Sequence, residues 1–205
     1  PPLSEQSSNA ICDEINDVTD SGSGLLAEGI YGIGDIISLE NILKESDYCY
    51  PPDSLGKSFS FTQPANTVFM IEISASWWAP CVQSIPEGEE IYETWKEDSR
   101  VKIIHVLDDI GMPYSCTQWG DFTGTISIDS DDEYPEIPNI PPIIDDGSAG
   151  NGQLRDLFPE NPLVANSYYP VTIFIDHHMR IIHIEHGSIY IDDANLYINC
   201  MLDAM

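Results

Sequence analysis

The sequence predicts an α/β fold, because apolar strand-like segments alternate with segments that have the period of an amphipathic helix. Residues 68–73 are almost continuously apolar and lead directly into the turn Trp77-Trp78-Ala79-Pro80-Cys81. A second apolar segment covers residues 101–107. A third begins at Tyr169-Pro170 and runs to Asp176. Strands and helices that alternate in this way are typical of a sheet with helices packed on it.

The remaining elements follow from periodicity and turn residues. In chain order we expect a short strand at 58–62, a helix from Cys81 to about Asp98, a short helix at 114–122, a proline-containing strand at 140–145, the start of a helical connection at 154–158, a final strand at 181–185 and a helix at 191–205. In the first helix the glutamates form the solvated side, and the opposite side is an apolar stripe of Ile85, Ile91, Tyr92 and Trp95.

Three regions of the chain differ in composition. Residues 1–24 are polar and acidic and are expected to form a flexible leader. Residues 25–58 are expected to form an N-terminal extension packed on the core, and residues 59–205 the α/β domain, with an acidic insertion at about 123–139. The first residues resemble a mature or trimmed end, so we expect no signal or anchor within this chain, and this expectation does not indicate the cytoplasm.

The charge balance narrows the class of partner. The chain has 35 Asp and Glu residues against 7 Lys and Arg residues, a formal net charge of −28. This balance argues against binding to nucleic-acid backbones and to anionic lipid surfaces. No apolar run reaches the length of a membrane span. We therefore expect a protein partner or larger assembly in an extracytoplasmic setting, whether periplasmic, cell-surface or secreted.

Metal and cofactor sites are not expected. The acidic run at residues 129–133 offers oxygen ligands, but it lacks an EF-hand frame, so a solvated loop is favoured over a calcium site. Four histidines near the last hairpin are favoured as exposed side chains over metal ligands: His177, His178, His183 and His186. His105 lies inside an apolar strand and is expected to be a hydrogen-bonded core residue. The sequence calls for no cofactor.

The five cysteines are an odd number, so at least one is unpaired: Cys12, Cys49, Cys81, Cys116 and Cys200. Cys12 and Cys49 both precede the predicted domain, where a disulfide would stabilise a segment with little core of its own. We expect this pair to be bonded, with two buried thiols as the alternative.

The turn at residues 77–81 resembles the Trp-Cys-x-Pro-Cys active site of the thioredoxin-like superfamily, with Trp78 in place of the first cysteine. Residues 169–176 resemble the family segment that carries a cis-proline opposite the active-site cysteines, which is Pro170 here. The order of elements resembles the extracytoplasmic thiol-disulfide reductases and the redoxin relatives of alkyl hydroperoxide reductase, over about residues 59–203. The resemblance implies a central mixed sheet flanked by helices.

The same resemblance implies that thiol chemistry is weakened. Thiol-disulfide exchange needs an attacking thiolate, and Trp78 cannot supply one. Cys81 occupies the position of the buried resolving cysteine, and Ser84 replaces a glutamate of the family pattern. A peroxidase is also disfavoured, because the peroxidatic enzymes of the family have Thr or Ser where this chain has Trp78.

A shallow apolar surface beside the turn grips peptide in thioredoxin-like proteins, and four residues here are candidates for it: Trp77, Trp78, Tyr168 and Tyr169. Trp78 has an alternative, which is to fold over Cys81 and fill the vacated site. Two functions remain. The favoured one is a redox-degenerate, non-catalytic binding or structural component of an extracytoplasmic assembly. The alternative is a thiol-disulfide oxidoreductase that uses Cys81, with or without Cys116.

Overall fold

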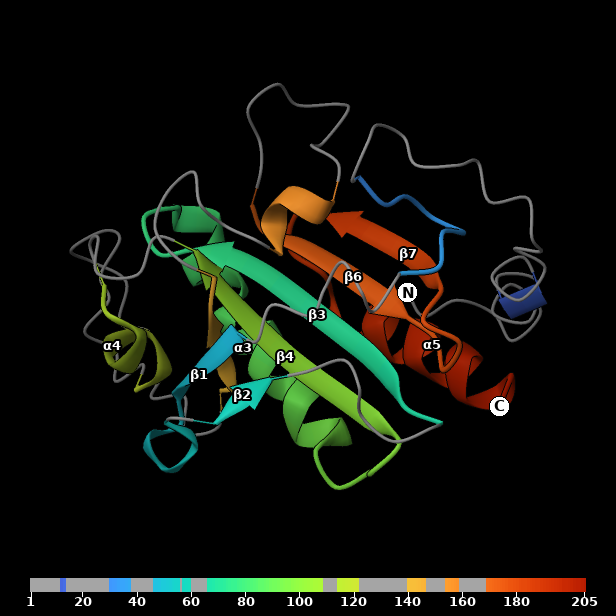
Figure 1. Ribbon diagram of the computed structural model, residues 1–205, viewed down its shortest axis with the longest axis horizontal. Helices are drawn as coiled ribbons and strands as arrows, with labels where there is room; N and C mark the ends of the chain where they lie inside the picture. The colour runs from blue at the N-terminus through green and yellow to red at the C-terminus, as the bar shows by residue number, and fades with distance from the viewer. Residues whose placement is uncertain are drawn as a thin grey trace.

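A computed structural model describes residues 12–13, 30–37, 46–55, 57–59, 66–108, 114–121, 140–146, 154–158 and 169–205. The elements in these residues are, in chain order, β1 (Ser46–Tyr50), the 3-10 turn η1 (Pro52–Ser54), β2 (Ser58–Phe59), β3 (Val68–Ala75), α3 (Ala79–Trp95), β4 (Val101–Asp108), α4 (Cys116–Gly120), β5 (Ile143–Asp145), the 3-10 turn η2 (Arg155–Leu157), β6 (Val171–Ile175), β7 (Ile181–His186) and α5 (Ile191–Asp203) (Figure 1).

These strands form one mixed sheet in the order β2-β1-β5-β4-β3-β6-β7. The strands β3, β4 and β5 are parallel, whereas β6 is antiparallel to β3 and β7 to β6. Every residue of β3 is buried, because it lies between two strands and has packed layers on both faces. The predicted mixed sheet flanked by helices is therefore confirmed, and α3 makes the crossover that the parallel pair β3–β4 requires.

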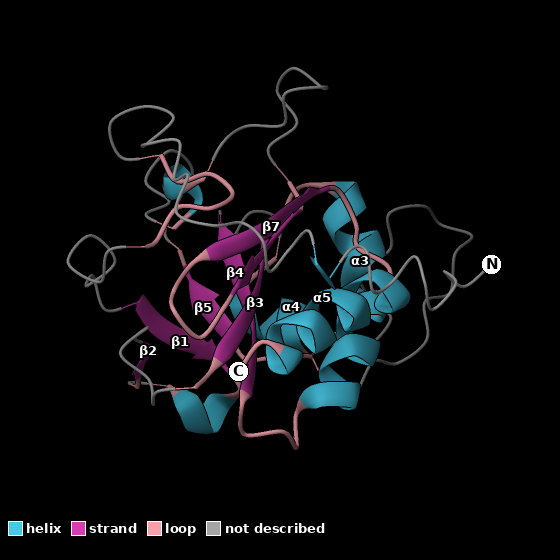
Figure 2. Cartoon of the chain, turned by 90° about the vertical axis from the view of Figure 1, so that its right-hand side faces the viewer, coloured by secondary structure: helices cyan, strands magenta, loops and turns pink. Residues whose placement is uncertain are grey.

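The two faces of the sheet are covered differently. On one face, α3 and α5 pack side by side, and Ile91 and Ile198 join Met70 in a shared apolar cluster (Figure 2). On the other face, the apolar cluster around Ile71 is completed by side chains from the segments 30–37 and 154–158. The turn that leads into α3 therefore lies on the face covered by helices, and short segments cover the opposite face.

The described part of the N-terminal extension is built into the fold. Tyr31 and Ile37 are buried, and the Ile37 backbone N–H donates to the Met179 carbonyl at 2.8 Å. Ile36 also forms a bridge with Arg180, just before β7. A difference from the sequence prediction is β1, which pairs with both β2 and β5 although no strand was predicted there. The strand is short and runs into two prolines, a pattern that is more typical of a turn than of a strand.

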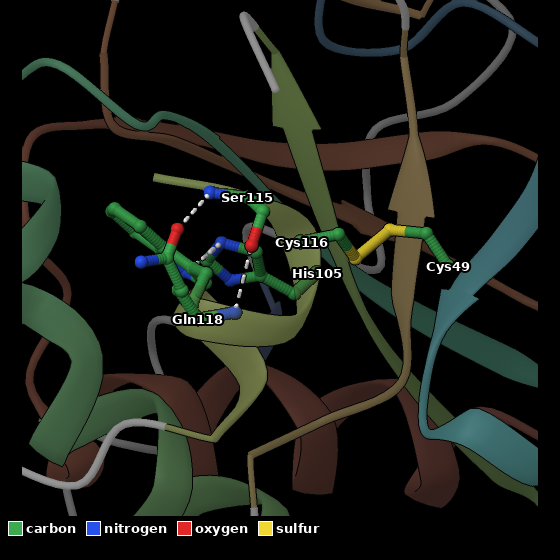
Figure 3. Close-up of a disulfide and its surroundings, with 6 residues drawn as sticks. Cys49, His105, Ser115, Cys116 and Gln118 are labelled. Carbon is green, nitrogen blue, oxygen red and sulfur yellow. Dashed lines mark hydrogen bonds between the residues drawn. A yellow bond between two sulfur atoms is a disulfide. The ribbon is translucent and has the colours of Figure 1, made fainter. Parts of the chain in front are cut away.

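The disulfide prediction for Cys12 and Cys49 is wrong. Cys12 is bonded to Cys200 on α5, and Cys49 on β1 is bonded to Cys116 at the start of α4 (Figure 3). The Cα–Cα distances are 5.1 Å and 6.0 Å, within the range that a disulfide spans. Because Cys49 lies on a strand beside α4, its partner is set by the sheet and not by proximity in sequence. Cys81 is a free thiol, so it is not bonded to Cys116.

The short helix α4 is fixed at its start by a capping box. The Ser115 hydroxyl accepts from the Gln118 backbone N–H at 3.2 Å, and the Gln118 side chain accepts from the Ser115 N–H at 2.9 Å (Figure 3). From the same helix, the Trp119 indole N–H donates to Nε2 of His105 at 3.1 Å. His105 is thus a hydrogen-bonded core residue, as predicted.

Candidate functional site

The candidate site is centred on the turn between β3 and α3. The Trp78 backbone N–H donates to the Ala75 carbonyl at 3.1 Å, and the Cys81 N–H donates to the Trp78 carbonyl at 2.9 Å. Pro80 lies in the first turn of α3, where a backbone N–H has no partner inside the helix. The sequence therefore ends the strand and starts the helix within three residues, and Trp78 is the last residue before the helix.

The Cys81 thiol lies below this turn and is sealed from solvent. Its side chain is 0% exposed, and its sulfur accepts from the Ala75 backbone N–H at 3.5 Å. Burial raises the pKa of Cys81 to about 12, and this effect exceeds the opposing hydrogen bonds from Ala75 and Ser74. Because the thiolate is the nucleophile in exchange chemistry, this thiol is both inaccessible and protonated at neutral pH.

A buried carboxyl group, Glu72, lies beside Cys81. Its Oε1 accepts from the Ser84 hydroxyl at 2.8 Å and from the Ser74 hydroxyl at 3.4 Å. Burial raises the pKa of Glu72 to about 7, although both serine hydroxyls favour the charged form. Gly88 leaves room for this carboxyl, because a Cβ there would lie 3.2 Å from Oε2. Glu72 was not singled out from the sequence. The signal that could have identified it is a single acid in an otherwise apolar strand.

The opposite side of the site is formed by the residues before β6. The Tyr169–Pro170 peptide bond is cis, as the resemblance implied. The Tyr169 hydroxyl donates to Oδ2 of Asp108 at the end of β4, and burial together with this bond raises the pKa of Tyr169. The Arg155 guanidinium lies 5.6 Å from the centre of the Tyr169 ring and is itself buried. Asp108 and Arg155 were not predicted, since only the fold brings them to Tyr169.

The exposed surface of the site is an aromatic patch, defined here as Trp77, Trp78 and Tyr169. Trp77 meets Tyr169 edge-to-face with ring centres 6.1 Å apart, and it meets Trp78 in the same manner at 5.7 Å. Trp77 is 49% exposed and Trp78 is 38% exposed. Trp78 is therefore an exposed residue and not part of the core. Tyr168, the fourth predicted member, lies outside the described residues.

Two further polar groups, His183 and Asp146, already have partners. His183 stacks on Tyr197 at 4.1 Å and approaches Glu185 at 3.2 Å. Asp146 accepts from the backbone N–H groups of Leu154 and Arg155 at 2.8 Å and 3.0 Å, so it caps η2. Within the described ranges, no three His, Cys, Asp or Glu residues are arranged to hold a metal ion. The acidic run at 129–133 and the rest of the predicted insertion lie outside those ranges.

No protein-family model and no curated protein sequence matches this chain. Solved structures do match. StoA from Bacillus subtilis is 14% identical with a TM-score of 0.50, over 75% of this chain and 94% of that one. A thioredoxin family thiol:disulfide interchange protein from Chlorobium tepidum is 17% identical with a TM-score of 0.49, over 72% and 88%.

A third match is a putative thiol:disulfide interchange protein DsbE from Chlorobium tepidum, which is 16% identical with a TM-score of 0.48, over 79% of this chain and 98% of that one. The similarity to StoA shows that the chain has a thioredoxin-like fold, and at 14% identity it shows the fold alone. Among the described residues, no helix is both long enough and apolar enough to cross a membrane.

Proposed function

We propose that this chain is a non-catalytic thioredoxin-like domain that binds a protein partner in an extracytoplasmic assembly through the aromatic patch. The observation that carries the proposal is the state of Cys81. Four of the five cysteines are in disulfides, and the remaining thiol is buried, with a pKa raised to about 12. No accessible thiolate is present to begin an exchange reaction.

The aromatic patch supports the binding part of the proposal. Trp and Tyr are enriched among the residues that anchor protein interfaces. Trp77 and Trp78 are exposed, and their mutual contact and the contact of Trp77 with Tyr169 hold the rings in one arrangement. Rings that are already fixed lose less conformational entropy when a partner binds, so more of the contact energy appears as affinity.

The cysteine pairing supports the extracytoplasmic part. Two disulfides that join distant parts of the chain persist in oxidising compartments and are rare in a reducing cytosol. The large acidic surplus is compatible with the same setting, since net charge keeps a protein soluble.

The test is an insulin-reduction assay with dithiothreitol. We expect the native chain to give no acceleration over dithiothreitol alone, whereas Trp78→Cys gains activity, because the substitution puts an exposed thiol at the start of α3 near Cys81. The matched control is Tyr190→Cys, which places a thiol on a residue that is 67% exposed at the start of α5 and should stay inactive. Native turnover that Cys81→Ser abolishes would instead establish the alternative, a thiol-disulfide oxidoreductase.

A further inference from the structure

We propose that the partner segment that docks on the aromatic patch is basic, with Lys or Arg side chains placed against the faces of Trp77 and Trp78. This inference rests on the proposed function and adds the chemistry of the partner to it. The first observation is the distribution of positive charge, the second is the local surplus of carboxylates, and the third is the arrangement of the rings.

Apart from Arg155, the cations of the described residues lie away from the patch. Lys102 pairs in register with Phe69 near the start of β3, and Arg100 immediately precedes β4 at the same end. Arg180 lies beside Ile181, which pairs with Ile175 opposite Phe69. From Phe69 to the patch end of β3 the strand spans about 20 Å. This exceeds the Debye length of about 8 Å at physiological salt, so these cations do not neutralise the patch.

Two further lysines among the described residues are either paired with an acid or far from the patch. Lys96 follows the C-terminus of α3 and pairs with Glu93 at 2.7 Å. The Lys57 carbonyl accepts from the backbone N–H of Tyr48 on β1, which lies three strands from β3, or about 14 Å across the sheet. Among the described residues, the cation at the patch end is therefore Arg155, and it is buried.

Carboxylates are in excess at the same end of the sheet. Asp108 ends β4 in register with Ala75, Asp145 ends β5 in register with Leu107, and Asp146 follows it. Asp145 is exposed. Asp108 and Asp146 are buried and accept hydrogen bonds from Tyr169 and from the backbone of η2, so Asp145 is the exposed carboxylate of these three, and the chain as a whole carries a formal charge of −28. A negative field of this kind attracts a basic segment and raises its rate of association.

The rings are suited to cations. A guanidinium or ammonium group over an indole face is attracted by the quadrupole of the ring, and tryptophan is the best of the aromatic residues for this contact. The patch already contains one such pair, between Arg155 and Tyr169. Trp77 and Trp78 keep exposed surface for a second cation from the partner, and the acidic surplus of the chain would complement the charge of that cation.

The test compares three fluorescein-labelled nine-residue peptides of equal length, in which alternating positions are all Arg, all Gln or all Glu and the others are Ser. Binding to the whole chain is followed by fluorescence anisotropy at 20 mM and 300 mM NaCl. We expect the Arg peptide to bind about tenfold or more tightly than the Gln peptide, the Glu peptide not to bind, and the affinity for the Arg peptide to fall with salt.

The variants locate the binding. Trp77→Ala should weaken binding of the Arg peptide about tenfold, Trp77→Phe should retain part of it, and the control Tyr190→Ala should leave it unchanged, since Tyr190 is an exposed aromatic outside the patch. Circular dichroism of each variant is the check that it is folded. Equal binding of the Arg peptide by Trp77→Ala would reduce the effect to general charge attraction and overturn the proposal.

Two other results would also overturn it. If none of the peptides binds, the partner is not a basic segment. If the Gln or Glu peptide binds as well as the Arg peptide and Trp77→Ala abolishes that binding, the preference for basic partners fails while the patch remains a binding surface. The proposed absence of catalysis is tested separately by insulin reduction, so the failures of the two proposals are distinguishable.

Discussion

The two sides of the turn between β3 and α3 differ in the groups that they contain and in whether solvent or a partner can reach those groups. Below the turn lie Cys81 and Glu72, the groups capable of thiol or proton chemistry, and both are buried. Above the turn lies the aromatic patch, which is accessible but has no nucleophile. In a catalytic site the reactive group and the accessible surface coincide. Their separation here is the reason for proposing a binding function instead of thiol-disulfide exchange.

The largest expected effect concerns the sealed side. At pH 8 we expect the Cys81 thiol of the folded chain to react with a disulfide reagent at least about 1000-fold more slowly than in urea, because it is buried and its pKa is raised to about 12. Release of the coloured thiolate from 5,5′-dithiobis(2-nitrobenzoate) measures both rates on the same sample. Fast labelling without urea would show that the Cys81 thiol is accessible and reactive. The two sides of the turn would then not differ in the way described.

A second test uses the titration of Glu72. The pKa is about 7 in the folded chain against 4.5 as the ordinary value, so the folded state binds the extra proton between these pH values. Stability is therefore expected to fall as pH rises from about 4.5 to about 7, by on the order of 3 kcal/mol. Urea unfolding of the native chain and of Glu72→Gln across this range measures the effect, which the variant should lack.

The titration of His105 changes stability with pH in the opposite direction, so its contribution must be separated from that of Glu72. Burial lowers the pKa of His105 to about 4, so the unfolded chain takes up the proton first and stability rises with pH between about 4 and 6.5. The difference between native and Glu72→Gln cancels this contribution. A difference that does not change with pH would show that Glu72 titrates normally, and hence that this side of the turn is open to water.

The smallest effect concerns the accessible side. Tyr169→Phe removes the hydroxyl that donates to Asp108 and should cost about 1–2 kcal/mol of unfolding free energy, because a hydrogen bond to a charged group is lost. The matched control Tyr190→Phe alters an exposed tyrosine and should stay within about 0.5 kcal/mol of the native chain. Equal stabilities for the two variants, measured by urea unfolding, would show that Asp108 does not hold the patch.

The parts of the fold that the sequence predicts well are those with a strong local signal. The strands β3, β4 and β6 are apolar over five to eight residues, and the turn before α3 has a distinctive composition. By contrast, β1 is short, and its pairing depends on β5, which lies about 95 residues later. Local patterns therefore located the centre of the sheet and missed one strand of the extension.

The candidate site was predictable to the same extent. Trp77, Trp78, Cys81 and Pro170 could be named because each is in or near a recognisable motif. The contacts of Tyr169 with Asp108 and Arg155 could not, since these residues come from separate elements that only the folded sheet brings together. The predicted pairing of the cysteines was wrong for the same reason, because spacing along a chain does not determine disulfide connectivity.

The Cys12–Cys200 disulfide has a consequence for how the chain would respond to proteases. The bond joins residues 188 positions apart, so almost the entire polypeptide is a covalent ring. A single backbone cut between these two cysteines opens the ring but leaves both pieces in one molecule. A nicked chain would therefore keep its full mass on a non-reducing gel and separate into fragments only after reduction.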